Sequence, residues 1–373
     1  SQKAILLAFT QTNPENNLAA NSTENTGVTA NERTIARRPR KMKILVAFDY
    51  PLTPPKDGDY AAQLSADDWR PIRNVSEAIT RLGHEAILQG VFDNIMPLIT
   101  TVRRRKPDLV FNMLETFRQE RKYEGALAGL FDLLQVPYTG CSAAALTICR
   151  NKQYTKQLLS QYEILIPKSV LFPRGKTNRS VKDLRFPVIV KPLGLEGSDG
   201  ISQASFVEDE KACVERVKTL HETYEVDAIA EEYIEGREIY AGVLGLDKLT
   251  ALPLREMLFT NFPEDRPKFA TFHAKWNPEF RKKWGIKNTF AKGIDEKVEA
   301  EIEIISKTAF RALGLSGFAR LDLRLTDKNE IYVIEVNPNP NIANDDEIAY
   351  ASQRLGISYD QLIQKLIDYG KRK

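Results

Sequence analysis

Three oxygen-bearing side chains near the C-terminus, Asp322, Glu335 and Asn337, occur in a pattern that suits a metal ion. They lie in GFARLDLRLTDKNEIYVIEVNPNPN, where LDLRL alternates apolar and polar residues and IYVIEV is β-branched and aromatic. Two strands joined by the turn TDKNE would bring these oxygens to one point. Mg²⁺ prefers about six oxygen ligands and usually takes one or two carboxylates plus substrate phosphates. The pattern therefore predicts a magnesium site for nucleotide chemistry.

Glu335 is the residue on which this prediction depends most. A carboxylate within an apolar strand is rarely buried without a partner, so a structural ion pair is the alternative to a metal ligand. The adjacent Arg320 and Asp322 favour a working site.

A glycine-rich loop follows a buried strand in FPVIVKPLGLEGSDGI. Lys191 stands at the end of the strand, and Gly194, Gly197, Ser198 and Gly200 follow it. Glycines let backbone N–H groups approach phosphates closely, and a lysine adds a positive charge. Because the spacing fits neither a Walker A loop nor a dinucleotide fingerprint, a surface hairpin explains the loop equally well when it is taken alone.

Two further segments complete a candidate nucleotide site. AEEYIEGRE offers a strand, a short linker and Glu238, which could place backbone groups on an adenine edge and a carboxylate on ribose hydroxyls. An acidic surface turn is the alternative. Lys152 begins a helix, where its ammonium group either reaches a phosphate or is solvated. In their order along the chain, these residues supply every part that binding of a magnesium nucleotide requires.

The whole sequence has ordinary globular composition, with 373 residues of which 42% are hydrophobic and 28% charged, enough for two or three domains. Its 53 basic and 50 acidic residues leave a formal charge of +3, so neither a nucleic-acid nor a membrane partner is expected. No apolar stretch approaches the roughly 18 residues that cross a bilayer. Three widely spaced cysteines argue against a disulfide framework, and we expect a cytoplasmic protein.

The domain organisation is predicted from the alternation of elements. Residues 1–41 are polar and are expected to form a flexible extension. Residues 42–145 alternate buried strands with helices, which indicates an α/β domain with a parallel sheet. Residues 146–236 and 237–373 are expected to form two mixed α+β subdomains. Within them we predict one helix from Ser142 to Tyr162 and a long loop from about Asn261 to Thr289, which is expected to act as a lid.

This ordered set of motifs resembles the ATP-grasp superfamily and is most similar to D-alanine–D-alanine ligases, from about Met42 to the end of the chain. The resemblance implies a Rossmann-like N-terminal domain followed by two subdomains that clasp ATP. VPYTGCSAAALTICRNK and VIVKP are similar to the segments that carry the two ATP-binding lysines, which correspond to Lys152 and Lys191. AEEYIEGRE resembles the adenine hinge, with Glu231, Glu232 and Ile234 beside the base and Glu238 on the ribose.

The resemblance also implies roles near the reacting phosphate. Arg320 would stabilise the phosphoryl group, and HAKW resembles the lysine motif of the loop that closes over ATP, so Lys275 would contact phosphate. Gly197 and Ser198 would contact the nucleotide, with Ser198 also a catalytic candidate. Two Mg²⁺ ions, or Mn²⁺ in their place, would be held by Asp322, Glu335 and Asn337.

For such ligases, ATP activates a carboxylate as an acyl phosphate, which an amine attacks to form an amide with release of ADP and phosphate. The expected partners are small carboxylate and amine substrates, such as amino acids or short peptides. A homodimer is one arrangement consistent with the family. Formation of D-alanyl-D-alanine is the family default, and a ligase for another substrate is the alternative. A nucleotide-binding protein without catalysis is a third reading, which Arg320 argues against because binding alone does not need it.

The substrate end departs from the family pattern. The first loop, FDYPLTPPKDGDY, lacks the family's glutamate, which Asp49, Asp57 or Asp59 would replace unless they only solvate a turn. The His-Gly dipeptide is absent, although Glu124 lies near the expected place of a carboxylate. His273, two residues before Lys275, is a candidate substrate contact.

After Asn337 the family's Ser-Pro-Gly is replaced by Pro-Asn-Pro-Asn, and an acidic run follows. That run, formed by Asp345, Asp346 and Glu347, favours a cationic or larger amine.

Overall fold

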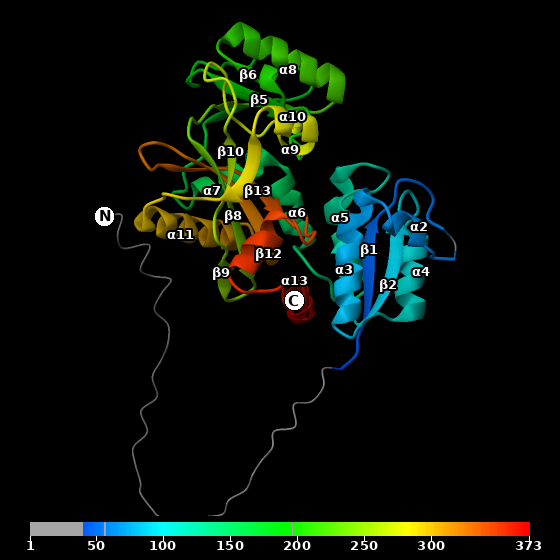
Figure 1. The fold of residues 1–373 in the computed structure, drawn as a ribbon. Helices are drawn as coiled ribbons and strands as arrows, with labels where there is room; N and C mark the ends of the chain where they lie inside the picture. The colour runs from blue at the N-terminus through cyan, green and yellow to red at the C-terminus, as the bar shows by residue number, and fades with distance from the viewer. Residues whose placement is uncertain (1–39, 56, 196) are drawn as a thin grey trace, which may run out of the picture. The chain divides into compact units, whose positions relative to one another are not determined.

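The structure is a computed structural model that describes residues 40–55, 57–195 and 197–373 (Figure 1). Residues 1–39 of the predicted extension therefore lie outside the described residues. Lys41–Lys373 form one compact unit.

A parallel three-stranded sheet forms the N-terminal part, as predicted. Its strand order is β2-β1-β3, and every residue from Ile44 to Phe48 of the central strand is buried. Such continuous burial is expected when a parallel sheet is covered on both faces. In Figure 1, α3 and α4 lie to either side of the sheet. The elements of this part are β1 (Lys43–Asp49), α2 (Ala61–Leu64), α3 (Arg70–Arg81), β2 (Glu85–Val91), α4 (Met96–Arg105), β3 (Leu109–Met113) and α5 (Glu124–Leu133).

The helix predicted from Ser142 to Tyr162 is two helices, α6 (Ala143–Arg150) and α7 (Lys152–Ser160). The break is at Asn151, whose backbone is extended and whose side chain accepts hydrogen bonds from the N–H groups of Gln153 and Tyr154. An asparagine that caps a new helix in this way competes with continuation of the old one. As a result, Lys152 occupies the first position of α7.

The next part is a four-stranded antiparallel sheet of order β4-β7-β5-β6, with α8 packed on β5 and β7. α8 begins where Asp209 accepts a hydrogen bond from the N–H of Ala212. Lys191 lies on β5, and Glu231 on β7 lies opposite Ile189, which precedes Lys191 by two residues on β5. The elements are β4 (Ser169–Phe172), β5 (Val188–Pro192), β6 (Phe206–Val207), α8 (Glu210–Tyr224) and β7 (Ala228–Glu232).

A second antiparallel sheet follows the order β11-β10-β8-β12-β13, with β9 paired to β8. The antiparallel pairing expected for IYAGVLG and LTALPLREMLF is present as β8, β9 and β10. The elements are β8 (Arg237–Gly245), β9 (Leu249–Ala251), β10 (Arg255–Phe259), β11 (Ile286–Phe290), α11 (Glu296–Ala312), β12 (Gly317–Leu325), β13 (Ile331–Pro338), α12 (Glu347–Arg354) and α13 (Tyr359–Arg372).

The long loop predicted from about Asn261 to Thr289 was wrong in part, because it contains α9 (Phe272–Trp276), α10 (Pro278–Lys283) and most of β11. Thr271 and Asn277 cap the two helices through their side chains. Phe262, Phe280 and Trp284 form edge-to-face contacts nearby. Two caps and an aromatic cluster are therefore enough to order this polar segment.

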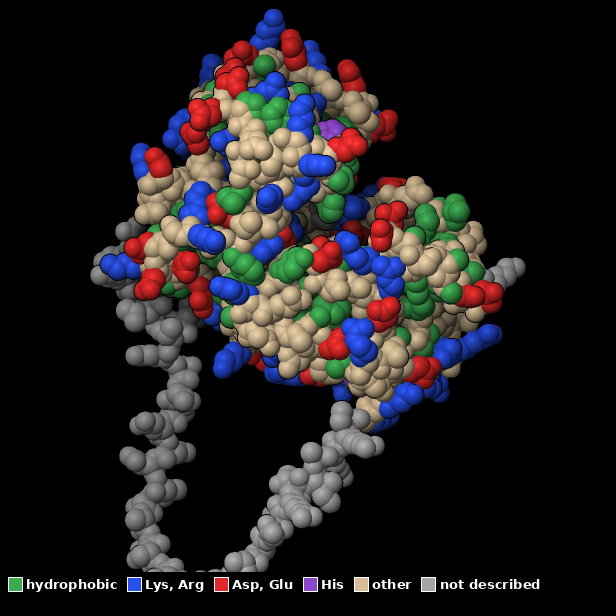
Figure 2. All heavy atoms as spheres, in the orientation of Figure 1, with side chains coloured by type: hydrophobic (Ala, Val, Ile, Leu, Met, Phe, Trp, Pro, Cys, Tyr) green, Lys and Arg blue, Asp and Glu red, His purple; other side chains and the backbone are tan. Residues whose placement is uncertain are grey.

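Two buried hydrophobic clusters join the parallel sheet to the C-terminal sheet. One contains Leu45 and Phe131 together with Leu321 and Val333, and the other contains Phe48 with Phe318. None of the helices within the described residues is both long and apolar enough to cross a bilayer. Acidic and basic side chains are interspersed over the face drawn in Figure 2.

Candidate active site

The antiparallel pair β12–β13 brings the predicted metal ligands together. Asp322 lies opposite Glu335, and Arg320 lies opposite Asn337. Because residues two apart on a strand share a face, all four side chains lie on one face of the hairpin. A register shift between Asp322 and Leu323 marks a bulge beside this group. Such bulges re-aim side chains in a strand pair.

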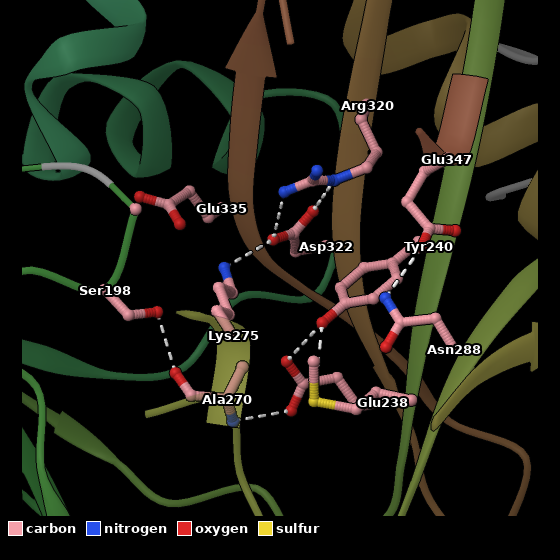
Figure 3. Close-up of polar contacts among 12 residues, drawn as sticks. Ser198, Glu238, Tyr240, Ala270, Lys275, Asn288, Arg320, Asp322, Glu335 and Glu347 are labelled. Carbon is pink, nitrogen blue, oxygen red and sulfur yellow. Dashed lines mark hydrogen bonds and ion pairs between the residues drawn. The ribbon is translucent and has the colours of Figure 1, made fainter. Parts of the chain in front are cut away.

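Arg320 and Lys275 both approach Asp322. Arg320 Nε is 2.7 Å from Oδ1 and its Nη2 is 3.0 Å from Oδ2, and Lys275 Nζ is 3.6 Å from Oδ2 (Figure 3). Burial alone would lower the pKa of Arg320, but the charge of Asp322 raises it above its ordinary value. The guanidinium therefore remains positive at this position.

Glu335 has its own cationic partner. Lys152 Nζ lies 3.0 Å from Glu335 Oε1 and donates to the backbone oxygen of Leu195 at 2.6 Å. Burial opposes the charge of Glu335, but Lys152, Lys275 and Lys191 together hold its pKa down to about 2. The ion pair that the sequence left as an alternative is therefore present, and its partner is one of the predicted phosphate-binding lysines.

The donor set on this face fits Mg²⁺. It offers two carboxylates and the amide of Asn337, whose buried Nδ2 forms no hydrogen bond within the described residues. Turning that amide to present its oxygen to a cation would break no bond of the nitrogen. No group of three or more His, Cys, Asp or Glu side chains suited to a metal occurs in the described ranges. A metal here would need further oxygens from phosphate, as Mg²⁺ usually does.

A cavity of about 80 Å³ beside the hairpin contains most of the predicted nucleotide contacts. Lys275, Asp322 and Glu335 line it on the side of the metal ligands. Gly197, Arg320 and Asn337 line a neighbouring larger cavity instead, which Lys275 also reaches. Lys152 lines neither of the two and contacts the site through Glu335. The other predicted residues that line the smaller cavity are Lys191, Ser198, Glu231, Glu232, Ile234 and Glu238.

The carboxylates of the predicted adenine hinge already have protein partners. Glu231 is 2.7 Å from Lys191 Nζ, and Glu232 accepts hydrogen bonds from Arg185. The role expected for Glu232 beside the base stays a prediction, and its carboxylate is held by Arg185.

Glu238 is the predicted ribose contact. It accepts hydrogen bonds from Arg324 Nη2 at 2.9 Å, from the N–H of Ala270 at 3.1 Å and from the hydroxyl of Tyr240 at 3.2 Å. The ribose role of Glu238 stays a prediction.

Two buried cations of the site were missed from the sequence. Lys156 lies 3.4 Å from Glu231, and Arg324 binds Glu238 and lines the smaller cavity. Their positions carried a signal, since Lys156 follows Lys152 by one helical turn and Arg324 follows Asp322 by two residues on a strand.

Lys275 lies on a short helix, α9, and not on a loop as expected. Three hydrogen bonds of the described residues join the lid segment to the glycine-rich loop, one of them from the N–H of Phe272 to the backbone oxygen of Ile201 at 3.0 Å. Trp276 Nε1 donates to the backbone oxygen of Gly197 at 2.7 Å. Ser198 Oγ donates to the backbone oxygen of Ala270 at 2.8 Å, as Figure 3 shows. These bonds hold the two segments closed on each other beside Lys275.

His273 does not line either of the two cavities, so its predicted substrate contact is not supported. Its exposed ring lies near Phe272 and Phe280, with centroid distances of 5.9 and 5.7 Å. It is a packing residue of the lid.

The larger cavity measures about 510 Å³ and is lined by the ends of β1 and β3, by the lid and by the segment after β13. Asp49 lines it and accepts a hydrogen bond from the hydroxyl of Thr116 at 2.9 Å. Burial raises the pKa of Asp49 to about 7. Asp57 and Asp59 do not line the cavity, and Asp59 accepts a hydrogen bond from the N–H of Ala61 in a turn. Glu124 lines it and is ion-paired with Arg150.

The acidic run after β13 contributes less free charge than its sequence suggests. Asp345 is paired with Arg70 at 3.2 Å, and Glu347 with Arg255 at 2.7 Å. Asp346 accepts a hydrogen bond from the N–H of Ala343, and burial raises its pKa to about 6. The preference for a cationic amine is weakened, because these carboxylates already have partners in the fold.

The family of the chain follows from its similarity to known proteins. The family model described as D-ala D-ala ligase C-terminus matches residues 159–368, more than half of the chain. The chain belongs to this family. A D-alanine–D-alanine ligase of Carboxydothermus hydrogenoformans is 30% identical over 287 residues, covering 71% of this chain and 86% of that protein. The uncharacterized protein y4sG of Sinorhizobium fredii is 29% identical over 308 residues, covering 80% and 87%.

Solved structures of this ligase family share the fold. The D-alanine–D-alanine ligase of Bacillus anthracis, solved in complex with ATP, has a TM-score of 0.66 at 19% identity and covers 89% of this chain and 97% of its own. The predicted ATP-grasp fold, with a parallel sheet followed by antiparallel sheets, is confirmed. Membership of the ligase family makes the chain an ATP-dependent enzyme that forms carbon–nitrogen bonds.

Proposed function

We propose that the chain activates a small carboxylate with ATP and joins it to an amine, with amino acids or short peptides as substrates. One observation carries the proposal: Asp322 and Glu335 face each other on β12 and β13, and each contacts cations that could hold phosphate. The proposed metal ligands are Asp322, Glu335 and Asn337, for two Mg²⁺ ions that Mn²⁺ can replace. When bound, the metal neutralises phosphate charge.

The lysines and Arg320 position the triphosphate in this proposal. Lys152 and Lys191 approach the inner phosphates, and Lys275 and Arg320 approach the γ-phosphoryl group. Each of Lys152, Lys275 and Arg320 now contacts a carboxylate assigned to the metal. With a magnesium nucleotide present, each carboxylate could take the cation and each basic side chain a phosphate. The net charge of the buried cluster would then change little, which favours joint binding.

The reaction proceeds in two transfers. A carboxylate oxygen of the acid bonds to the γ-phosphorus as the bond to the β,γ-bridging oxygen breaks, giving an acyl phosphate and ADP. The amine nitrogen then attacks the carbonyl carbon, loses a proton, and phosphate leaves from the tetrahedral intermediate. No nucleophilic serine or cysteine is needed. The bonds of Trp276 and Ser198 would keep the lid closed and limit hydrolysis of the acyl phosphate.

The larger cavity is the proposed substrate site, because Arg320, Lys275 and Asn337 line it beside Asp49 and Glu347. D-Alanine is the default for both substrates. The volume of about 510 Å³ and the altered first loop favour a different amino acid or a peptide for at least one of them.

Arg281 adds information on the substrate. It also lines the larger cavity, and its guanidinium donates hydrogen bonds to the Ala274 carbonyl and to Asn288, with no ion pair among the described side chains. A guanidinium without an ion-pair partner could bind a substrate carboxylate that takes no part in the reaction, on either the acid or the amine.

A pooled substrate assay tests the proposal. Phosphate release would be measured with ATP, Mg²⁺ and mixtures of D- and L-amino acids and dipeptides, and products would be identified by mass spectrometry. We expect release to require both substrates and to yield an amide, and D-alanyl-D-alanine would establish the default. Tight nucleotide binding without release in any pool would instead support a binding protein without catalysis.

We also propose that the enzyme works in the cytoplasm, where ATP and Mg²⁺ are available. Its three cysteines are buried thiols and form no disulfide with one another, as is common in a reducing compartment. A homodimer stays a prediction that gel filtration with light scattering would test.

A further inference from the structure

A lysine that none of the roles above uses, Lys156, is buried in the wall of the nucleotide site. It lies on α7 four residues after Lys152, so both side chains project from the same face of the helix. Only 4% of Lys156 is exposed. A lysine is almost never buried to this extent unless it is paired.

Lys156 forms an ion pair with Glu231, with Nζ 3.4 Å from Oε1. Neither of these two atoms forms a hydrogen bond within the described residues. The other oxygen of Glu231 lies 2.7 Å from Lys191 Nζ. Glu231 therefore bridges two lysines, and it holds Lys191 more closely than Lys156.

The charges of this bridge depend on one another. Burial would raise the pKa of Glu231, but Lys156 and Lys191 together lower it below its ordinary value. Burial lowers the pKa of Lys156 to about 8, against the opposing effect of Glu231. The other charges near Lys156 are those of Lys191 and Glu335. A single buried carboxylate is thus shared between two buried ammonium groups.

We propose that Lys156 is a positioning residue for the nucleotide: by sharing Glu231 with Lys191, it leaves the Lys191 ammonium free to hold the triphosphate. The proposal rests on the assignment of Lys191 to phosphate under the proposed function. Without Lys156, Glu231 would keep a single ion-pair partner, Lys191, and its negative charge would neutralise the Lys191 ammonium. The triphosphate would then compete with Glu231 for Lys191.

Calorimetric titration of the full chain with ADP at saturating Mg²⁺ tests the proposal without any acid or amine substrate. Lys156→Met is expected to raise the Kd by about tenfold, which corresponds to about 1.4 kcal/mol. The matched control is Lys218→Met, which removes an exposed lysine of α8 and is expected to leave the Kd unchanged. Lys156→Gln is the second variant. Its neutral amide still offers Glu231 a donor, so the fold is supported while the charge is removed, and a similar rise in Kd is expected.

A double-mutant cycle with Glu231→Gln shows whether the effect passes through Glu231. In the Glu231→Gln background the ion-pair partner of Lys191 is gone, so adding Lys156→Met is expected to change the Kd by less than about twofold. An equal loss of affinity in both backgrounds would mean that Lys156 acts on phosphate directly, and would overturn the proposal.

An unchanged Kd in Lys156→Met and in Lys156→Gln, with or without a lower melting temperature, would show that Lys156 has only a structural role. That result would also overturn the proposal. If the wild-type chain itself failed to bind Mg²⁺-ADP, the proposed function would fail first, and the role of Lys156 would fail with it. The two failures are therefore distinguishable.

Discussion

At the scale of single residues, Glu335 keeps a negative charge in a place where burial opposes it. Three lysines lower its pKa to about 2, and the nearest, Lys152, lies 3.0 Å away. An ion pair of this kind stabilises a fold only weakly, because the cost of removing both charges from water offsets their attraction. A structural role is therefore a poor explanation for the pair. A role in binding a metal and a phosphate explains both charges.

Replacing Glu335 by Gln tests this role. The substitution preserves the shape of the side chain but removes a proposed metal ligand, so turnover should fall by at least about a hundredfold while the fold is retained. Phosphate release at saturating Mg²⁺ and circular dichroism would measure the two effects. Glu330→Gln, an exposed change just before the same strand, is the matched control and should be active. Near-normal activity of Glu335→Gln would remove Glu335 from the metal site.

Asp49 provides a prediction about pH. Its pKa is about 7 in the folded chain against an ordinary value of 3.8, so between these pH values the folded state binds a proton that the unfolded state has lost. The wild type should therefore lose stability as pH rises from about 4 to 7, relative to Asp49→Asn. Asn can accept the backbone bonds of Glu115 and Thr116 with its oxygen and donate to the Thr116 hydroxyl with its nitrogen.

Melting temperatures of both proteins at pH 5, 6, 7 and 8 would measure this effect. The advantage of Asp49→Asn should grow up to about pH 7 and then level off. A difference in melting temperature that does not vary with pH would show that the pKa of Asp49 is not raised.

The limits of sequence reasoning at this scale follow from burial. Arg320, Asp322, Glu335 and Asn337 could be found because a charged residue in an apolar strand is visible in the sequence itself. Lys156 and Arg324 were missed, because their spacing from Lys152 and Asp322 indicates a shared face but does not reveal that tertiary packing will enclose them. The Arg185 partner of Glu232 was hidden for the same reason, as it is distant in sequence.

At the scale of elements, the position of Lys152 depends on a helix break. The apolar periodicity from Ser142 to Tyr162 is continuous, and it therefore predicted one helix. The break depends on the Asn151 side chain, which caps α7 in a conformation that the pattern does not reveal. The strands of the metal hairpin were easier to predict, because β-branched residues and alternation agree there. Short capped helices such as α9 and α10 were missed because each has too few residues to show a period.

Asn151→Ala tests whether the cap of α7 positions Lys152 as well as stabilising the fold. Loss of the cap should cost about 1 kcal/mol of stability and also loosen the start of α7, so the affinity for Mg²⁺-ADP should fall. Asp209→Ala is the matched control, since it removes the cap of α8 and should cost similar stability without a change in affinity. Thermal melting and calorimetric titration would measure the two quantities. Equal affinities in both variants would mean that the break does not position Lys152.

At the scale of the whole molecule, the metal hairpin is tied to the segment that follows the parallel sheet. Asn339, just after β13, accepts a hydrogen bond from the N–H of Cys141 at 2.8 Å. Gly140 makes the close approach feasible, because it has a φ of +88° and an added Cβ would lie 2.4 Å from Asn339 Oδ1. This polar contact supplements the two hydrophobic clusters shared by the sheets. Asn339 belongs to the Pro-Asn-Pro-Asn segment that departs from the family pattern, and this segment thus connects the metal hairpin to the segment after the parallel sheet.

Asn339→Ala should leave the Cys141 N–H without its partner and lower stability by about 1–3 kcal/mol. Gly140→Ala should also destabilise, through its positive φ and its collision with Asn339. In the double variant the collision is absent, so the combined loss should be smaller than the sum. Urea denaturation midpoints of the three variants would show this. Strictly additive losses would mean that the two residues do not interact.

The central claim is that this hairpin and its cations direct the γ-phosphoryl group of ATP onto a carboxylate. Oxygen transfer tests it most directly. The amino-acid and dipeptide pools would be labelled with ¹⁸O in their carboxylates, and the enzyme should release phosphate that carries one labelled oxygen. In the acyl phosphate one carboxylate oxygen is bonded to phosphorus, and this oxygen leaves with the phosphate when the amine displaces it from the carbonyl carbon. Amide formation accompanied by phosphate without label would contradict the account.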